Sequence, residues 1–246
     1  MSYFKRIFFR IKYFYFSFLK KSINTNSYYG VKLFPLWEDQ TFKFCFRGDY
    51  GDFFSNFLKK IDSQFVFIDI GANQGLYSII AGKNSNCQKI YSVEPQKKIL
   101  KVLKKNFEIN NITRYEVLPY AISNVKSKAK LVKYKYHSGK GSLKQNEIIS
   151  ENHFEKIETI DSNFLKEIFN SSLNYVIKID VEGHEDIVIN EILKVKHLNK
   201  NSVIFYEVNT NWVDPKFIEE VLKKSGFKYF KKIGSSKTHY DVLATR

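Results

Sequence analysis

The stretch Gln64-Phe65-Val66-Phe67-Ile68-Asp69-Ile70-Gly71-Ala72-Asn73-Gln74-Gly75 decides the fold of this 246-residue chain. Its first half is a continuous apolar run, which is typical of a parallel strand buried on both faces. Residues 71–75 predict a tight turn, and a helix is expected to begin at Leu76. Strand, glycine turn and helix in this order form a place where the backbone approaches a ligand closely, because glycine has no Cβ atom.

The next strand adds a carboxylate that narrows the choice of ligand. Glu94 ends the predicted strand 89–94, 19 residues after Gly75, where it can accept hydrogen bonds from both hydroxyls of a ribose. Asn73 replaces the middle glycine of the dinucleotide pattern G-x-G-x-x-G and leaves less room for a pyrophosphate. Asp69 stands where it can hold a cationic group. S-adenosylmethionine, with an ammonium and a sulfonium but no phosphate, fits these features better than a nicotinamide dinucleotide; a purely structural turn is the remaining alternative.

The chain from residue 65 onward alternates predicted strands with predicted helices. Further strands are expected over residues 114–120, 175–180 and 202–208, and helices over 96–107, 157–169, 185–193 and 215–225. A hairpin over 227–233 and 239–245 closes the chain. This alternation predicts an α/β domain over residues 65–246, with an open, mostly parallel sheet and an antiparallel strand at or near one edge.

The first 64 residues precede this pattern and fall into two parts. Residues 1–21 carry six basic residues and no acidic one, and their apolar side chains lie mainly on one half of a helical wheel. The segment is either a basic amphipathic helix on an anionic membrane or a helix that packs its aromatic side on the domain. Its longest uncharged run, 13–19, is too short to span a bilayer. Residues 22–64 form an accessory region with expected strands at 31–34 and 41–46 and a helix at 52–61.

Polar side chains follow the predicted strand 175–180, at the edge where open α/β sheets bind ligands. Asp180, Glu182 and His184 are the candidate catalytic residues, since histidine suits general-base work near neutrality. Glu207, at the end of the next strand, could reach the same crevice. Each of the three also has a structural interpretation, as a helix cap, a first-turn charge and a surface histidine. Consecutive loop residues rarely complete a metal shell, so no required metal is predicted.

Composition bears on partners and on the cellular compartment. The formal net charge of +15 suits a polyanion, an anionic membrane face or an acidic substrate. However, the chain has 35 lysines and only 5 arginines, and specific phosphate and base recognition relies on the guanidinium fork. Nucleic acid is therefore an unlikely partner by composition. Cys45 and Cys87 form no metal motif and indicate a reduced, cytoplasmic protein, at the inner face of the membrane if residues 1–21 bind lipid.

Several segments, in order, resemble motifs of the FkbM family of S-adenosylmethionine-dependent methyltransferases. The likeness covers residues 65–230 and rests on Phe67–Ser78, Val93–Pro95 with Asn110 and Asn111, Ala121–Asn124, Gly139–Leu143 and Ile177–Glu185. The resemblance implies a Rossmann-like class I methyltransferase fold, a seven-stranded sheet with one antiparallel strand and helices on both faces. It also implies O-methylation of a sugar in a glycan, glycolipid or related metabolite. By the same resemblance, the cofactor would be held by Asp69, Gly71, Asn73, Gly75 and Glu94, with Ala121 and Ile122 facing the adenine.

Two other functions remain as alternatives. The net charge favours an RNA or other nucleic-acid methyltransferase, although no Asn-Pro-Pro-Tyr-like motif follows the strand 175–180 to stack a flipped base. A non-catalytic membrane-surface protein that retains the fold is the second alternative. Failure to bind S-adenosylmethionine would favour this second alternative.

Overall fold

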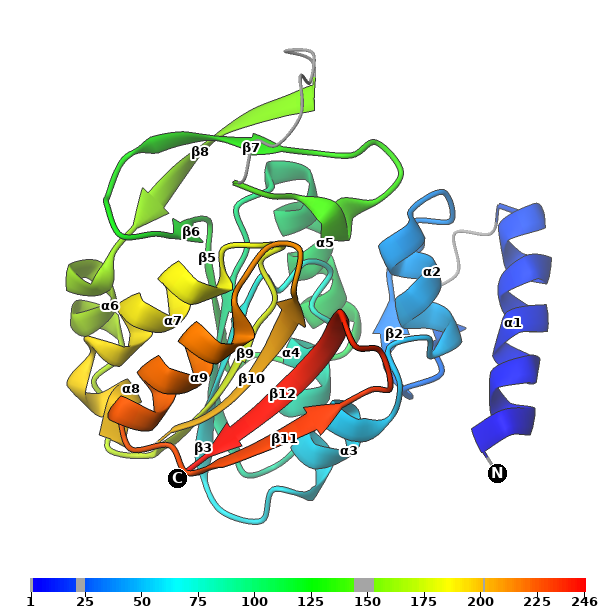
Figure 1. The fold of residues 1–246 in the computed structure, drawn as a ribbon. Coiled ribbons are helices and arrows are strands. Elements are labelled where there is room, and N and C mark those ends of the chain that lie inside the picture. Colours follow the sequence, from blue (N-terminus) through cyan, green and yellow to red (C-terminus); the bar gives the residue numbers. More distant parts are fainter. Residues whose placement is uncertain (1, 21–24, 144–152, 201) are drawn as a thin grey trace.

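The computed structural model describes residues 2–20, 25–143, 153–200 and 202–246, and within them a seven-stranded sheet forms the centre (Figure 1). Met1 and Lys21 of the predicted amphipathic segment lie outside the described residues. The strand order is β11-β12-β10-β9-β3-β4-β5, and β12 alone runs antiparallel, between β10 and β11. The strands are β3 (Phe65–Ile70), β4 (Cys87–Val93), β5 (Tyr115–Leu118), β9 (Asn174–Ile179), β10 (Ser202–Asn209), β11 (Tyr229–Ile233) and β12 (His239–Thr245). The predicted fold class is confirmed.

Strand β3 lies inside the sheet, between β9 and β4, and divides its side chains between two cores. All six of its residues are buried. Val66, Ile68 and Ile70 join one apolar cluster, whereas Phe65 and Phe67 join the other, as the two-residue repeat of a strand requires. The first cluster lies under α6 (Ser162–Ile168), α7 (Glu185–Leu193), α8 (Lys196–Lys200) and α9 (Pro215–Lys224), and the second under α3 (Phe53–Lys60), α4 (Leu76–Gly82) and α5 (Lys97–Ile109).

The N-terminal region packs against the second cluster and contains a first correction. It consists of α1 (Ser2–Phe18), β1 (Thr25–Asn26), β2 (Lys32–Leu33), α2 (Gln40–Arg47) and α3. The strand predicted over 41–46 is helix α2. Its aromatic residues are typical of strands, but Phe42, Cys45 and Phe46 are buried at helical spacing, and the Asp39 side chain caps the helix by accepting the Phe42 N–H.

A second correction concerns the helix predicted over 157–169. The first part of that range belongs to β8 (Phe154–Ile160), which pairs with β6 (Ala121–Ile122) and β7 (Lys128–Val132) in a separate three-stranded sheet. Asp161 then caps α6, accepting backbone N–H groups of residues 163 and 164. The spacing of three residues between Ile157 and Ile160 is typical of one helix face, but in β8 the two side chains lie on opposite faces of the strand and both are buried.

Candidate functional site

A cavity of about 420 Å³ opens where the carboxyl ends of β3, β4 and β9 meet. Chain segments far apart in sequence line it, from α2 through the turn after β3 to β10 and the start of β12. Most predicted site residues line this cavity: Gly71, Asn73, Glu94, Ala121, Ile122, Asp180, Glu182 and His184. Asp69 and Gly75 lie outside the lining. The structure therefore brings the predicted cofactor and catalytic residues to one place.

The two glycines of the turn have packing reasons for their identity. Gly71 has φ +73°, and a Cβ atom there would stand 1.8 Å from the backbone oxygen of Asp180. Gly75 has φ +81°, and a Cβ atom there would stand 2.3 Å from Leu103 Cδ1. Glycine lets the turn lie against the end of β9 and against α5. We expected the absence of a Cβ atom at these glycines to leave space for a ligand. In the structure, atoms of Asp180 and Leu103 occupy that space.

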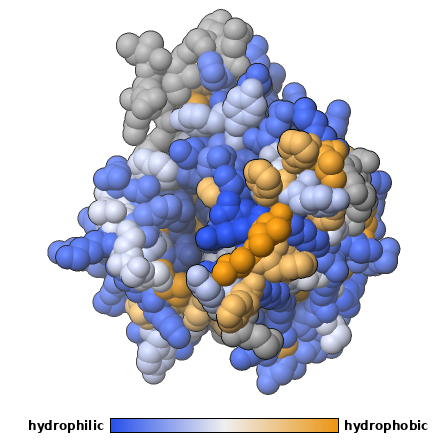
Figure 2. Space-filling model, turned by 90° about the vertical axis from the view of Figure 1, so that its right-hand side faces the viewer, coloured by the Kyte–Doolittle hydropathy of each residue, from blue (hydrophilic) through white to orange (hydrophobic). Residues whose placement is uncertain are grey.

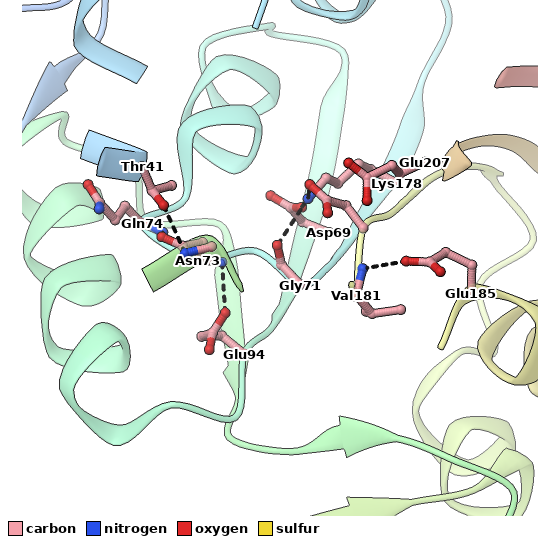
Figure 3. A network of polar contacts seen from close by, with 12 residues as sticks. Thr41, Asp69, Gly71, Asn73, Gln74, Glu94, Lys178, Val181, Glu185 and Glu207 are labelled. Carbon is pink, nitrogen blue, oxygen red and sulfur yellow. Dashed lines mark hydrogen bonds and ion pairs between the residues drawn. The ribbon is translucent and has the colours of Figure 1, made fainter. Parts of the chain in front are cut away.

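Glu94 joins the turn after β3 to the loop after β4 (Figure 3). Its buried carboxylate accepts the N–H groups of Asn73 and Gln96, each at 2.9 Å. Burial raises the pKa of Glu94 to about 7, against the lowering effect of these two hydrogen bonds. Asn73 itself has φ +49°, and its side-chain oxygen accepts the Ser138 hydroxyl at 3.0 Å. The carboxylate is thus fixed at the cavity wall before any ligand binds.

Asp69 lies beneath the turn, and the cation beside it is the Lys178 ammonium of the chain itself. Its carboxylate accepts the N–H and the hydroxyl of Ser78, and its other oxygen lies 3.6 Å from Lys178 Nζ. The Lys178 ammonium also donates to the Gly71 carbonyl at 3.0 Å and pairs with Asp180 at 3.2 Å. Burial lowers the pKa of Lys178, but Asp180 and Asp69 outweigh it and raise the pKa. No role is assigned to Lys178 from the sequence alone. The only indication was a charged residue inside an otherwise apolar strand.

Three carboxylates gather on the other side of Lys178. Asp180, Glu182 and Glu207 each offer an oxygen within 4.8 Å of the others, and we call them the carboxylate trio. Burial, then Asp180 and Glu207, raise the pKa of Glu182 to about 9. Burial and Asp180 likewise raise the pKa of Glu207. Such oxygens suit a hard cation, but the Lys178 ammonium already supplies positive charge beside Asp180.

Glu207 and His184 have different hydrogen-bond partners. Glu207 Oε1 lies 2.7 Å from His239 Nε2, and Glu207 Oε2 has no hydrogen-bond partner among the described residues. His184 Nε2 lies 3.2 Å from Ser123 Oγ, next to the predicted adenine-facing residues. Of the three predicted catalytic residues, Asp180 and Glu182 belong to the trio and His184 stands apart from it.

The accessory region completes the cavity, which sequence reasoning missed. Thr41, Phe44 and Cys45 of α2 line it together with the loop 137–141. Asp39 holds both pieces, because its carboxylate accepts the Ser138 N–H and the Gln74 side-chain amide, each at 2.8 Å. The resemblance drew attention to the Gly139–Leu143 loop. No motif in the sequence indicates that residues 39–45 contact this loop.

Sequence comparison identifies one matching family. Residues 69–229 match the family described as Methyltransferase FkbM domain. No curated protein matches the chain.

Solved structures with the same fold include methyltransferases of different kinds. A methyltransferase FkbM from Methylobacillus flagellatus KT is 12% identical, covers 74% of this chain and 44% of its own, and has a TM-score of 0.51. The aTrm5 complex with tRNALeu is 15% identical, with 87% and 49% covered and a TM-score of 0.50. A tRNA m1G37 methyltransferase from M. jannaschii is 14% identical, with 87% and 51% covered and a TM-score of 0.50. The chain spans about half the length of these structures, and at this identity the likeness concerns the fold.

Proposed function

The chain belongs to the FkbM methyltransferase family, and from that premise we propose that it transfers a methyl group to a sugar hydroxyl oxygen. S-adenosylmethionine is the methyl donor of this family. Glu94, at the cavity wall, would accept the ribose hydroxyls, and the backbone at Ala121 and Ile122 would face the adenine. Gly71 and Asn73 would shape the floor beneath the cofactor. Asp69 and Gly75 lie outside the lining, so we assign them the support of that floor.

The carboxylate trio is the observation that supports hydroxyl methylation. In the proposed step the acceptor oxygen attacks the methyl carbon, the carbon–sulfur bond breaks, and S-adenosylhomocysteine leaves. The hydroxyl proton passes to Glu207, whose Oε2 lacks a partner among the described residues and whose pKa is raised by burial and by Asp180, which makes it a stronger base. His239, half-exposed and 2.7 Å away on the other oxygen, can pass that proton to solvent.

The other members of the trio would position the acceptor. Asp180 and Glu182 carry several acceptor oxygens close together, which suits the adjacent hydroxyls of a sugar. Glu182, with its pKa near 9, is protonated at neutral pH and can also donate a hydrogen bond. His184, tied to Ser123, would act on the cofactor side. Both cysteines are buried and free, which supports the proposed cytoplasmic location.

The test uses S-adenosylmethionine with an isotope-labelled methyl group and a glycan fraction from the source cell. Wild-type protein should label the glycans, and Glu207→Gln should lower labelling at least about 100-fold while leaving cofactor affinity unchanged, as expected for a proton acceptor. His184→Asn serves as the comparison and should change cofactor affinity more than the rate at saturation. Full activity of Glu207→Gln would contradict the assigned base.

A nucleic-acid acceptor is the second candidate. The expectation that nucleic acid is an unlikely partner is not supported, since tRNA methyltransferases share the fold and the chain carries a formal charge of +15. The same labelled donor decides between the two. Label that enters RNA and is released by ribonuclease would favour the nucleic-acid acceptor, whereas label that resists nucleases and is released as a methylated sugar favours our proposal.

A further inference from the structure

Helix α1 presents a continuous band of large apolar side chains to solvent. The band, which we call the aromatic ridge, crosses the face of the molecule in Figure 2 with hydrophilic surface on its borders. Its side chains are between 37% and 79% exposed: Tyr3, Phe4, Ile7, Phe8, Ile11, Phe14, Tyr15, Phe18 and Leu19. An apolar band of this extent on a soluble surface marks a binding face.

The aromatic ridge is distinct from the face by which α1 packs on the protein. That inner face consists of Phe9, Tyr13 and Phe16, which contact the rings of Phe46, Phe42 and Trp37 of the accessory region. The Tyr13 hydroxyl also donates to the Trp37 carbonyl at 2.6 Å. The helix is therefore held in place with the ridge pointing outward. Of the two interpretations of residues 1–21, packing of aromatic side chains on the domain is observed for this inner face, and the membrane interpretation concerns the ridge.

Cations border the ridge on both sides and no acid interrupts it. At about 100° per residue, Lys5 and Lys12 stand on one border of the ridge, and Arg6 and Arg10 on the other. Arg6 and Arg10 also pair with Asp52 and Asp49, at 3.3 and 3.8 Å, whereas Lys5 and Lys12 lie over the rings of Tyr28 and Phe9 and have no carboxylate partner among the described residues. Residues 1–21 contain no acidic residue. Long basic side chains beside an apolar helix face reach the headgroups of an anionic bilayer while the apolar side chains enter its surface.

We propose that the aromatic ridge docks the protein on an anionic membrane surface, with α1 lying in the plane of the interface. Among the described residues no helix has the length and apolar character needed to cross a bilayer. The bordering charges favour a lipid surface over a second copy of the chain, because two paired ridges would bring the cations of both helices together. Lipid binding of this kind does not depend on methyl transfer.

Helix α2 lies between the docked helix and the cavity. Phe42 and Phe46 of α2 pack under α1, while Thr41 and Phe44 of the same helix line the cavity.

The experiment measures sedimentation of the full chain with vesicles of phosphatidylcholine containing about one third phosphatidylserine. Phe14→Ser with Phe18→Ser removes two ridge side chains that are 74% and 79% exposed, so folding should be unchanged. Phe217→Ser with Tyr229→Ser is the matched control, since these side chains are 48% and 67% exposed on α9 and β11. We expect the ridge variant to bind about tenfold or more weakly and the control to bind like wild type.

Lipid composition and self-association complete the test. Wild-type binding should fall on pure phosphatidylcholine vesicles and at high salt, because the bordering cations lose their partners. Equal binding of the ridge variant and wild type would overturn the proposal. So would a wild-type dimer that sedimentation velocity detects, that the ridge variant loses, and that fails to bind vesicles, since the ridge would then serve a second copy.

Discussion

The two halves of the cavity solve opposite electrostatic problems. In the half proposed for the cofactor, the Glu94 carboxylate already accepts two backbone N–H groups, and the Asn73 side-chain oxygen accepts the Ser138 hydroxyl. In the acceptor half, Asp180, Glu182 and Glu207 crowd three carboxylates into one place, and burial raises the pKa of the last two. The cofactor half is therefore preorganised, whereas the acceptor half retains carboxylates whose protonation can change.

Under the proposed function, cofactor binding and proton transfer fall to different parts of one crevice. Lys178 stands at the border between them, since it pairs with Asp69 below the turn and with Asp180 in the trio. A preorganised wall favours cofactor binding because no reorganisation opposes it. Carboxylates whose pKa is raised by burial favour proton transfer because they are stronger bases than exposed carboxylates.

The largest effect is expected for Gly71→Ala. The new Cβ atom would meet the Asp180 backbone oxygen at 1.8 Å in a left-handed conformation, so the turn must move. We expect cofactor affinity to fall by at least about 100-fold and stability to fall by roughly 3 kcal/mol or more. Calorimetric titration and thermal unfolding measure both.

Gly30→Ala is the matched control for this prediction. Gly30 has φ +80° with nothing within 4 Å of an added Cβ atom, so it reports the backbone strain alone, about 1–2 kcal/mol. If the two variants lose the same stability and both bind the cofactor, the close approach of the turn to β9 contributes neither to stability nor to cofactor binding.

Lys178→Met should produce the next largest effect, because it removes the charge shared by the two halves. Asp69 is 1% exposed and would keep a buried carboxylate without its cation. Breaking a buried pair in this way costs about 3–5 kcal/mol of stability. Chemical denaturation measures the loss, and Asp69→Asn in the same chain should restore part of it. Additive losses in the double variant would contradict the coupling.

The cofactor half was predictable and the acceptor half only in part, for a physical reason. Asp69, Asn73 and Glu94 occur in contiguous strand–turn units, whose order along the chain fixes their position in space. The contact of Asp39 with Ser138 joins residues 99 positions apart, and no local pattern encodes it. The strand predicted over 41–46 failed because aromatic residues fit strands and buried helices alike, and the cap at Asp39 decides between them.

Glu94→Gln is a milder substitution in the cofactor half. The amide keeps the shape of the side chain but loses the charge that accepts the Asn73 and Gln96 N–H groups. We expect S-adenosylmethionine to bind about 10- to 100-fold more weakly, since a hydrogen bond to a charged group contributes about 1.5–3 kcal/mol. Glu116→Gln, on a half-exposed side chain of β5, is the control and should bind normally. Unchanged affinity in Glu94→Gln would remove the ribose assignment.

The smallest effect concerns pH and the acceptor half. The pKa of Glu182 rises from 4.5 to about 9 on folding, so between these values the folded chain binds more protons at this site than the unfolded chain. This site therefore lowers stability as pH rises through that window, and its penalty is absent below pH 4.5. Glu182→Gln should be more stable than wild type at pH 9, by about 1 kcal/mol or roughly 2–4 °C in Tm, because water reaches part of this side chain and reduces the penalty.

The pH dependence of that difference is what distinguishes the charge from the shape of the side chain. At pH 5 wild type is itself protonated at Glu182 and should match the variant in Tm, whereas the gap should widen steadily towards pH 9. Asp186→Asn, on the first turn of α7, provides the comparison at a site outside the cavity lining. A Tm difference for Glu182→Gln that stays constant from pH 5 to pH 9 would mean that the carboxylates of the acceptor half do not compete for protons, and the contrast between the two halves would fail there.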